Sequence, residues 1–271
     1  MQLPQAIRRI TDPVIGRIPV PILGGENAGD LWSLASAGGG YMTGRRGAAQ
    51  IAAIGALLHE GDVVWDVGAH HGSVVLSAAR RVGRSGQVHA FEPAGLNRTY
   101  LERHVRWNRL TNVVIHSCAM SSYDGEATFG GSGSSTGYSL NKGDERVVVR
   151  TAASVVASGA APAPTFVKID VEDLEGDVLA GAASILRPDT RMIISVHSSR
   201  SHATCTAFLR GAGYEIVESR MLAAMVAGTW QGDPDMVCFG PGYAGLGRDR
   251  EILKSMSFEY PAPLKNSKVS F

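Results

Sequence analysis

Strand-like apolar runs alternate with segments of helical periodicity, and this alternation most constrains the fold of the chain. "DVVWDV" (62–67), "QVHAFE" (87–92) and "NVVIHSCA" (112–119) are predicted strands, and the segments between them, 72–83 and 94–108, are predicted helices. Short connections in this order favour parallel strands joined by right-handed crossovers. The sequence therefore predicts an α/β fold with a Rossmann-like, doubly wound, mostly parallel sheet.

The alternation stops after residue 119 and resumes at residue 165. Residues 120–150 carry "EATFG" and "RVVVR" around "GGSGSSTGYSL", a pattern that predicts a hairpin-like insertion with a mobile loop between strands 3 and 4. Four more strands complete a predicted seven-stranded sheet, the last two being antiparallel. These strands are expected at 165–172, 191–197, 214–220 and 236–240, with helices at 174–186 and 201–213.

We divide the chain into three parts. Residues 1–46 are Gly/Pro-rich and are predicted to be an irregular segment and candidate lid, to which Trp32 and Tyr41 contribute unless they pack in the core. Residues 47–240, which begin with a helix predicted at 47–61, form the domain. Residues 241–271 form a C-terminal tail to which the sequence assigns no structure.

Composition favours some classes of function over others. Lys and Arg total 26 and Asp and Glu total 25, so no basic excess favours a nucleic-acid groove. The three cysteines are far apart and lack metal-site spacing, which is typical of reduced thiols in the cytoplasm. No stretch approaches the ~20 apolar residues of a membrane span, and the N-terminus lacks an apolar signal region. We expect a soluble, cytoplasmic protein with no nucleic-acid or membrane partner.

The turn "DVGAHHG" (66–72) follows the first predicted strand, where ligands bind in an open parallel sheet. Gly68 would let the backbone approach a ligand or adopt positive φ, and Gly72 would let the next helix begin close to the strand. The dinucleotide pattern G-x-G-x-x-G is not met, because His70 stands where a middle glycine is needed. A nicotinamide-dependent oxidoreductase is therefore an alternative and not the main hypothesis.

Glu92 ends the second predicted strand, 20 residues after Gly72. A carboxylate at this place can accept hydrogen bonds from both hydroxyls of a ribose, as an adenosine cofactor requires. The alternative is that Glu92 only caps the helix that begins after Pro93.

"DVGAHHG", "VHAFEP", "VKIDVEDLE" and "VLAGAASIL", in this order, resemble the FkbM family of S-adenosylmethionine-dependent methyltransferases. The resemblance spans about residues 41–200 and implies a class I methyltransferase domain that binds S-adenosylmethionine. By this resemblance, the methionine end is held by Asp66, Gly68, Ala69 and Gly72, the ribose by Glu92 with Pro93 beside it, and the adenine lies near Ser117, Cys118 and Ala119.

The chain also departs from the family pattern. Gly44 matches a family glycine, but Arg45 and Arg46 follow where the family usually has a glutamate. Asp173 stands where the family usually has glycine, so the turn after Glu172 is expected to be built differently.

Lys168, Asp170 and Glu172 alternate with apolar residues and therefore share one face of a strand. Charges inside a sheet covered on both faces are costly unless they are paired or open onto a site. We predict Asp170 and Glu172 as catalytic residues and expect Lys168 to hold a neighbouring carboxylate. The alternative for Glu172, and for Glu175, is that acids at a helix start complement its dipole.

His197 ends the fifth predicted strand and is the third predicted catalytic residue, a base with a pKa near neutrality, unless it is a core histidine. We predict no metal site; a divalent metal held by Asp170, Glu172 and His197 is the alternative. One histidine of the His70–His71 pair is a candidate for cofactor or substrate contact, as is Tyr138.

The resemblance favours an O-methyltransferase that acts on a hydroxyl of a small molecule, such as a sugar or a secondary metabolite. A non-catalytic module of the same fold is the alternative from another class of function. The sequence leaves a homodimer open.

Overall fold

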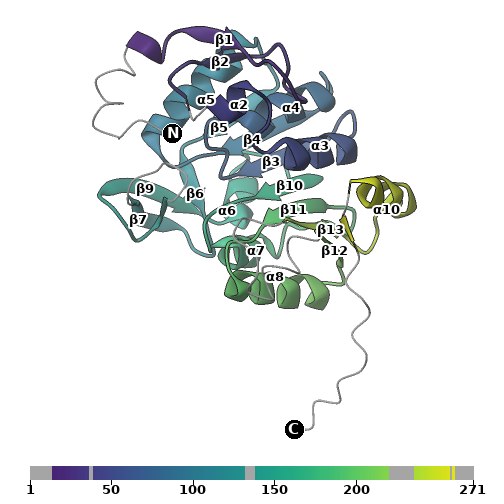
Figure 1. Cartoon of the computed structure of the whole chain (residues 1–271). Coiled ribbons are helices and arrows are strands. Elements are labelled where there is room, and N and C mark those ends of the chain that lie inside the picture. The colour runs from purple at the N-terminus through teal and green to yellow at the C-terminus, as the bar shows by residue number, and fades with distance from the viewer. Residues whose placement is uncertain (1–13, 37–38, 132–137, 220–234, 257, 260–271) are drawn as a thin grey trace.

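A mixed sheet of eight strands forms the centre of the computed structural model (Figure 1), which describes residues 14–36, 39–131, 138–219, 235–256 and 258–259. The strands β5, β4, β3, β10 and β11 run parallel to one another. The strands β13, β12 and β14 are each antiparallel to their neighbours. In spatial order the strands are β5 (Val113–His116), β4 (Gln87–Phe91), β3 (Val63–Val67), β10 (Phe166–Ile169), β11 (Arg191–Ser195), β13 (Asp235–Phe239), β12 (Glu215–Ser219) and β14 (Phe258–Glu259).

This order confirms the predicted α/β fold with a mostly parallel sheet and the antiparallel pairing of β12 with β13. The tail after Gly240, to which the sequence assigns no structure, contains helix α10 (Leu246–Ser255) and the short strand β14. The tail therefore adds an eighth strand beside the seven that were predicted.

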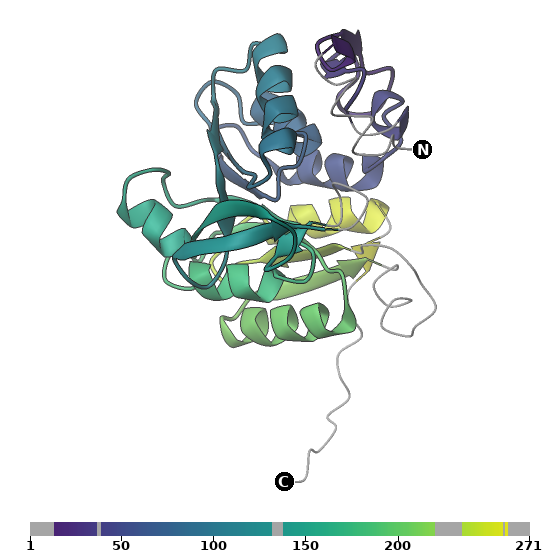
Figure 2. The same ribbon diagram turned by 90° about the vertical axis from the view of Figure 1, so that its left-hand side faces the viewer.

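Helices cover both faces of the sheet, as Figures 1 and 2 show. One face carries α3 (Ala48–Leu57), α4 (Ser73–Arg81), α5 (Gly95–Trp107) and α10, and the other carries α6 (Ala152–Ala157), α7 (Glu175–Ala182) and α8 (Ser199–Gly211). Each face has its own hydrophobic core, because successive side chains of a strand point to opposite faces. Along β3, for example, Val64 packs under α3 and α4, whereas Trp65 and Val67 pack toward α7.

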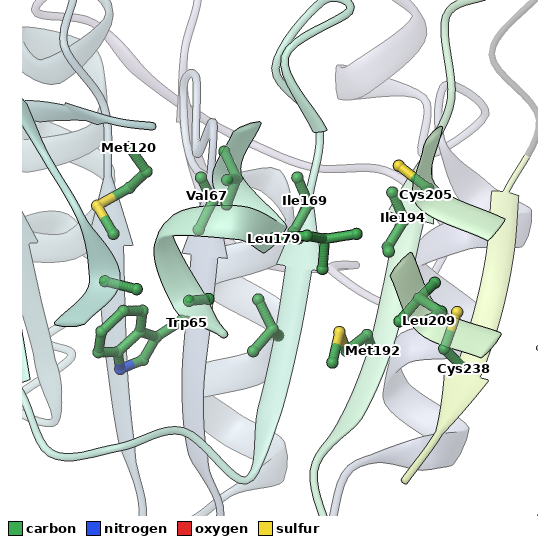
Figure 3. Close-up of a cluster of buried hydrophobic side chains, with 14 of the residues drawn as sticks. Trp65, Val67, Met120, Ile169, Leu179, Met192, Ile194, Cys205, Leu209 and Cys238 are labelled. Atoms are coloured by element: carbon green, nitrogen blue, oxygen red, sulfur yellow. The ribbon is translucent and has the colours of Figure 1, made fainter. Parts of the chain in front are cut away.

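Figure 3 shows the core on the α7 and α8 face. Trp65, Met192 and Ile194 extend from the sheet and meet Leu179 of α7 and Leu209 of α8. All five side chains are at most 1% exposed, and burying a side chain of this size contributes roughly 1.5–3 kcal/mol. This packing holds α7 and α8 against the strands whose ends carry the polar residues described below.

The predicted strand 112–119 is in fact two strands. After β5, the chain leaves the main sheet at Ser117, and β6 (Cys118–Met120) pairs in parallel with β9 (Glu145–Arg150). β7 (Gly125–Gly130) and β8 (Ser139–Leu140) complete a second sheet, in which β7 and β9 form an antiparallel pair at the predicted insertion. A small core of Ala119, Phe129 and Val149 stabilises this sheet. Of the mobile loop predicted over 130–140, residues 132–137 lie outside the described residues, and Ser139–Leu140 form β8.

The N-terminal segment is more regular than the sequence indicates. β1 (Pro19–Pro21) and β2 (Leu31–Ser33) form an antiparallel pair, and the short helix α2 (Gly39–Met42) follows. Trp32 is fully buried and stacks on His104 of α5 at 3.8 Å between ring centroids, so it is a core residue. Within the described part of the chain, no helix combines the length and the apolar composition needed to cross a membrane.

Candidate functional site

A cavity of about 530 Å³ opens beyond the carboxyl ends of the parallel strands, a size typical of small-molecule sites. Its wall combines the main sheet with α3 and the second sheet. The predicted site residues that line it are Gly68, Ala69, Glu92, Pro93, Cys118, Ala119, Asp170 and Glu172. Asp66, Gly72 and His197 do not line it.

The two glycines of "DVGAHHG" both adopt positive φ, 82° at Gly68 and 90° at Gly72. A Cβ atom at Gly68 would overlap the carbonyl oxygen of Asp170, so this glycine lets the ends of β3 and β10 approach each other. A Cβ atom at Gly72, the residue directly before α4, would overlap the side chain of Leu101, so this glycine also makes room for α5.

Glu92 is 4% exposed and lies at the end of β4. Its Oε2 accepts from the backbone N–H of His70 at 2.8 Å, and its Oε1 accepts from the N–H of Ala94 at 2.9 Å and from Asn97 at 3.2 Å. Burial raises the pKa of Glu92, and these donors oppose the increase. Glu92 thus caps the start of α5 and also lines the cavity, where Oε2 keeps a lone pair for a ligand hydroxyl.

A chain of hydrogen bonds runs from Glu92 to the N-terminal segment. Asn97 Oδ1 lies 3.2 Å from His71 Nε2, and His71 Nδ1 lies 2.7 Å from the hydroxyl of Ser36. Ser36, His71 and Asn97 are all buried. His71 is therefore a structural residue, whereas His70, its neighbour, lines the cavity.

Asp66 and Lys168 are register partners on β3 and β10 and form a buried ion pair of 3.1 Å. Lys168 Nζ also lies 3.4 Å from Asp170 Oδ2 and donates to the carbonyl of Gly68 at 3.0 Å. Burial alone would lower the pKa of Lys168, but the two carboxylates raise it above its ordinary value. Lys168 therefore holds neighbouring carboxylates, as expected, and Asp66 acts on the cavity wall only through Lys168.

His197 lies among three carboxylates. Its Nδ1 is 2.8 Å from Glu175 Oε1, and its Nε2 is 3.3 Å from Asp170 Oδ1 and 3.9 Å from Glu172 Oε2. Burial lowers the pKa of His197, but hydrogen bonds and charges from Asp170 and Glu175 raise it to about 11. At neutral pH the ring is an imidazolium ion, which differs from the near-neutral base expected from the sequence. The three predicted catalytic side chains do converge.

The turn after β10 accommodates the unusual Asp173. Both Glu172 and Asp173 have positive φ, 53° and 72°, and the latter is a conformation that glycine adopts more readily. Glu175, which is fully buried, accepts from the N–H of Asp173 at 3.2 Å and from the hydroxyl of Ser201. The carboxylate of Glu175 thus stabilises a turn in which position 173 adopts a conformation that favours glycine.

Three cavity residues were missed by the sequence analysis. Ser195, at the end of β11, donates to Asp235 Oδ1 at 2.8 Å, and Gln50 of α3 donates to both Asp235 Oδ1 and Ser195 Oγ at 2.8 Å. Asp235 begins β13, and because β13 is antiparallel, its first residue meets the edge where the parallel strands end. The predicted antiparallel pairing was the signal that could have identified it.

The outcome for the remaining candidates is mixed. Tyr41, Arg45, Arg46 and Tyr138 line the cavity. Cys118, Cys205 and Cys238 are buried thiols. Within the described residues, no group of three or more His, Cys, Asp or Glu side chains has the geometry to hold a metal ion.

Residues 66–216, more than half of the chain, match the family model of the methyltransferase FkbM domain. The chain belongs to the FkbM methyltransferase family. The family resemblance read from the sequence motifs is therefore confirmed. A comparison with curated proteins finds no match.

Solved structures resemble this chain in fold. The FkbM methyltransferase from Methylobacillus flagellatus KT has a TM-score of 0.51 and 18% identity, over 68% of this chain and 45% of that protein. The ribosomal protein L11 methylase from Lactobacillus delbrueckii subsp. bulgaricus has a TM-score of 0.50 and 12% identity, over 77% of this chain and 83% of that protein. The chain thus spans less than half the length of the Methylobacillus protein.

The residues that line the cavity could hold an adenosine cofactor such as S-adenosylmethionine. Glu92 offers a carboxylate to ribose hydroxyls, and the side chains of Cys118, Ala119 and Met120 provide an apolar wall for a base. The backbone of Gly68 and Ala69 lies at the adjacent strand end. The volume leaves room for a ligand of this size.

Proposed function

We propose that this FkbM methyltransferase transfers a methyl group from S-adenosylmethionine to a hydroxyl of a small molecule, such as a sugar or a secondary metabolite. The observation that carries the proposal is one continuous cavity, lined by Glu92 and Cys118 in one part and by Asp170, Ser195 and Asp235 in another. A single cavity of this kind brings a cofactor and an acceptor together in one enclosure.

Bound S-adenosylmethionine supplies an already activated methyl group, so the chain has mainly to position the acceptor and exclude water. Positioning of this kind contributes up to ~7–11 kcal/mol in favourable cases. In our assignment, Glu92 binds the ribose, the backbone at Gly68 and Ala69 binds the methionine end, and Cys118 and Ala119 contact the adenine. Asp170, Glu172 and His197 belong to the acceptor side.

Two alternatives are weaker. A non-catalytic module has no need for Asp170, Glu172 and His197 to converge. In this chain a carboxylate oxygen of Asp170 and one of Glu172 both lie within 3.9 Å of His197 Nε2. A nicotinamide-dependent oxidoreductase would need the glycine pattern that His70 interrupts. We further propose a cytoplasmic protein that acts without a nucleic-acid or membrane partner, alone or as a homodimer.

Calorimetry with S-adenosylmethionine and S-adenosylhomocysteine tests the proposal, with NAD(H) as a control ligand. We expect micromolar binding of the first two compounds only. Glu92→Ala should weaken their binding by roughly 1–3 kcal/mol through lost charge-assisted hydrogen bonds. Glu102→Ala, on the exposed side of α5, is the matched control and should bind as the wild type does. Binding of NAD(H) instead would refute the proposal.

The acceptor is then sought by S-adenosylhomocysteine release from a panel of hydroxyl compounds and their amine counterparts. Turnover of the hydroxyl compounds supports O-methylation, and turnover confined to the amines would refute it.

A further inference from the structure

The cluster of Gln50, Ser195 and Asp235 is the part of the cavity wall that the cofactor assignment leaves unused. Its three side chains come from α3, β11 and β13 and are joined by three hydrogen bonds of 2.8 Å. Ser195 and Asp235 are register partners. The cluster thus places a buried carboxylate, held by two hydrogen-bond donors, in the wall of the cavity.

The position of Asp235 along the sheet puts it on the acceptor half of the cavity. From β4, which carries Glu92, the strand order is β3, β10, β11 and β13. At about 4.8 Å per strand, Asp235 lies roughly 14 Å from the end of β3 and roughly 19 Å from the end of β4. The cofactor site assigned to β6, β4 and β3 therefore ends well before Asp235.

Both donors reach the same oxygen of Asp235. Gln50 and Ser195 donate to Oδ1, and Oδ2 makes no hydrogen bond to any residue that the structure describes. Because Asp235 lines the cavity, its second oxygen is the atom that can receive a proton from a ligand.

The charges around Asp235 suit proton exchange near neutral pH. Burial raises the pKa of Asp235, and hydrogen bonds from Gln50 and Ser195 oppose the increase; Asp170 raises the pKa and Lys168 lowers it, and the result is a pKa of about 6. Asp170 differs: burial would raise its pKa, but Lys168 and His197 hold it well below the ordinary value. Of Asp170, His197 and Asp235, only Asp235 changes charge close to pH 7.

We propose that Asp235 is the catalytic base, whose Oδ2 accepts the proton of the acceptor hydroxyl, and that Gln50 and Ser195 are positioning residues that hold Oδ1. This inference rests on the proposed function. The acceptor O–H bond breaks as its oxygen bonds to the methyl carbon. The carbon–sulfur bond of the sulfonium breaks with its electron pair left on sulfur, which yields S-adenosylhomocysteine. Asp235 then loses the proton to water.

The first test needs no acceptor. Full-length protein labelled with ¹³C at the aspartate Cγ is titrated in the presence of S-adenosylhomocysteine, and the Asp235→Asn spectrum identifies the Asp235 signal. We expect this carboxyl to titrate near pH 6. Gln50→Leu should move the titration to higher pH, because it removes a donor that stabilises the charged form. An Asp235 carboxyl that stays ionised down to pH 4 would overturn the proposal.

The second test measures turnover on the hydroxyl panel, which includes sugar acids and sugar phosphates because Arg45 and Arg46 line the same cavity. Asp235→Asn should lower kcat by about 10²–10⁴-fold and abolish the acidic limb of the pH profile, with S-adenosylhomocysteine affinity unchanged. The exposed Asp144→Asn is the control. Turnover of Asp235→Asn within about threefold of wild type would overturn the proposal.

The two levels of inference fail differently. Wild-type protein that binds no S-adenosylhomocysteine contradicts the proposed function itself. If S-adenosylhomocysteine binds normally but Asp235→Asn leaves turnover unchanged, only the assignment of the base is contradicted. If nothing in the panel is methylated, the NMR titration alone tests that assignment.

Discussion

Replacing His197 with glutamine should destabilise the fold strongly at neutral pH. The His197 ring is 7% exposed and bonds to Glu175, which is fully buried, and to Asp170. Glutamine retains a polar side chain of comparable size but carries no charge. The variant therefore leaves the Glu175 carboxylate buried without a cation beside it, while Asp170 keeps Lys168 as its partner.

Removing one partner of a buried ion pair costs about 3–5 kcal/mol. The unfolding entropy of about 2.1 cal/mol/K per residue gives about 0.57 kcal/mol/K for 271 residues, so Tm should fall by about 5–9 °C. The effect depends on pH. Because the folded-state pKa of His197 is raised to about 11, its contribution is complete below the unfolded pKa of about 6.5 and is lost as pH rises toward 11.

Thermal unfolding followed by circular dichroism at pH 6, 7, 9 and 10 measures this difference in Tm between wild type and His197→Gln. His202→Gln, which removes a half-buried imidazole from α8, is the matched control. We expect the gap to be largest at pH 6 and to narrow at each higher pH. A gap below about 2 °C at pH 6, or one that does not change up to pH 10, would refute the ion-pair interpretation.

Two further predictions concern the strand ends and the thiols. Gly68→Ala should lower the unfolding free energy by at least about 1–2 kcal/mol, because φ is 82° and the new methyl group overlaps the Asp170 carbonyl. Gly211→Ala is the control and should not lower it, because the space around Gly211 is open. Urea titration of both variants measures the difference. Cys205 and Cys238 should react with a thiol reagent only after denaturation, because both are fully buried and burial raises the pKa of Cys205 to about 12. Rapid labelling of either residue in the native protein would contradict this.

Seven of the eight strands of the main sheet could be predicted from short runs rich in apolar residues, whereas β14 lies in the tail to which the sequence assigns no structure. Helices α4 and α5 follow the periodicity of their sequences to within one or two residues at each end. The split between β5 and β6 could not be predicted in this way. Residues 112–119 were predicted as one strand, and only the pairing of β6 with β9, some 30 residues later, takes Cys118 into the second sheet.

The cofactor half of the cavity was predictable for the same reason as the sheet. Gly68 and Glu92 directly follow or end strands whose parallel order could be inferred, so their proximity follows from topology. The Asp235 cluster was not predictable, because Gln50 and Asp235 are separated by 185 positions and the contact requires the register of β11 on β13. The protonation of His197 likewise depends on distances to three carboxylates that no spacing in the sequence reveals.

The hydrogen-bond chain from Ser36 through His71 and Asn97 to Glu92 has a thermodynamic consequence. Binding at Glu92 and ordering of residues 31–36 share the same buried groups, so the two processes are linked equilibria. A ligand that holds Glu92 in place must stabilise the Ser36 contact by the same free energy that this contact contributes to ligand affinity. The β1–β2 segment therefore belongs to the energetics of the cavity although the strand pair itself forms no part of its wall.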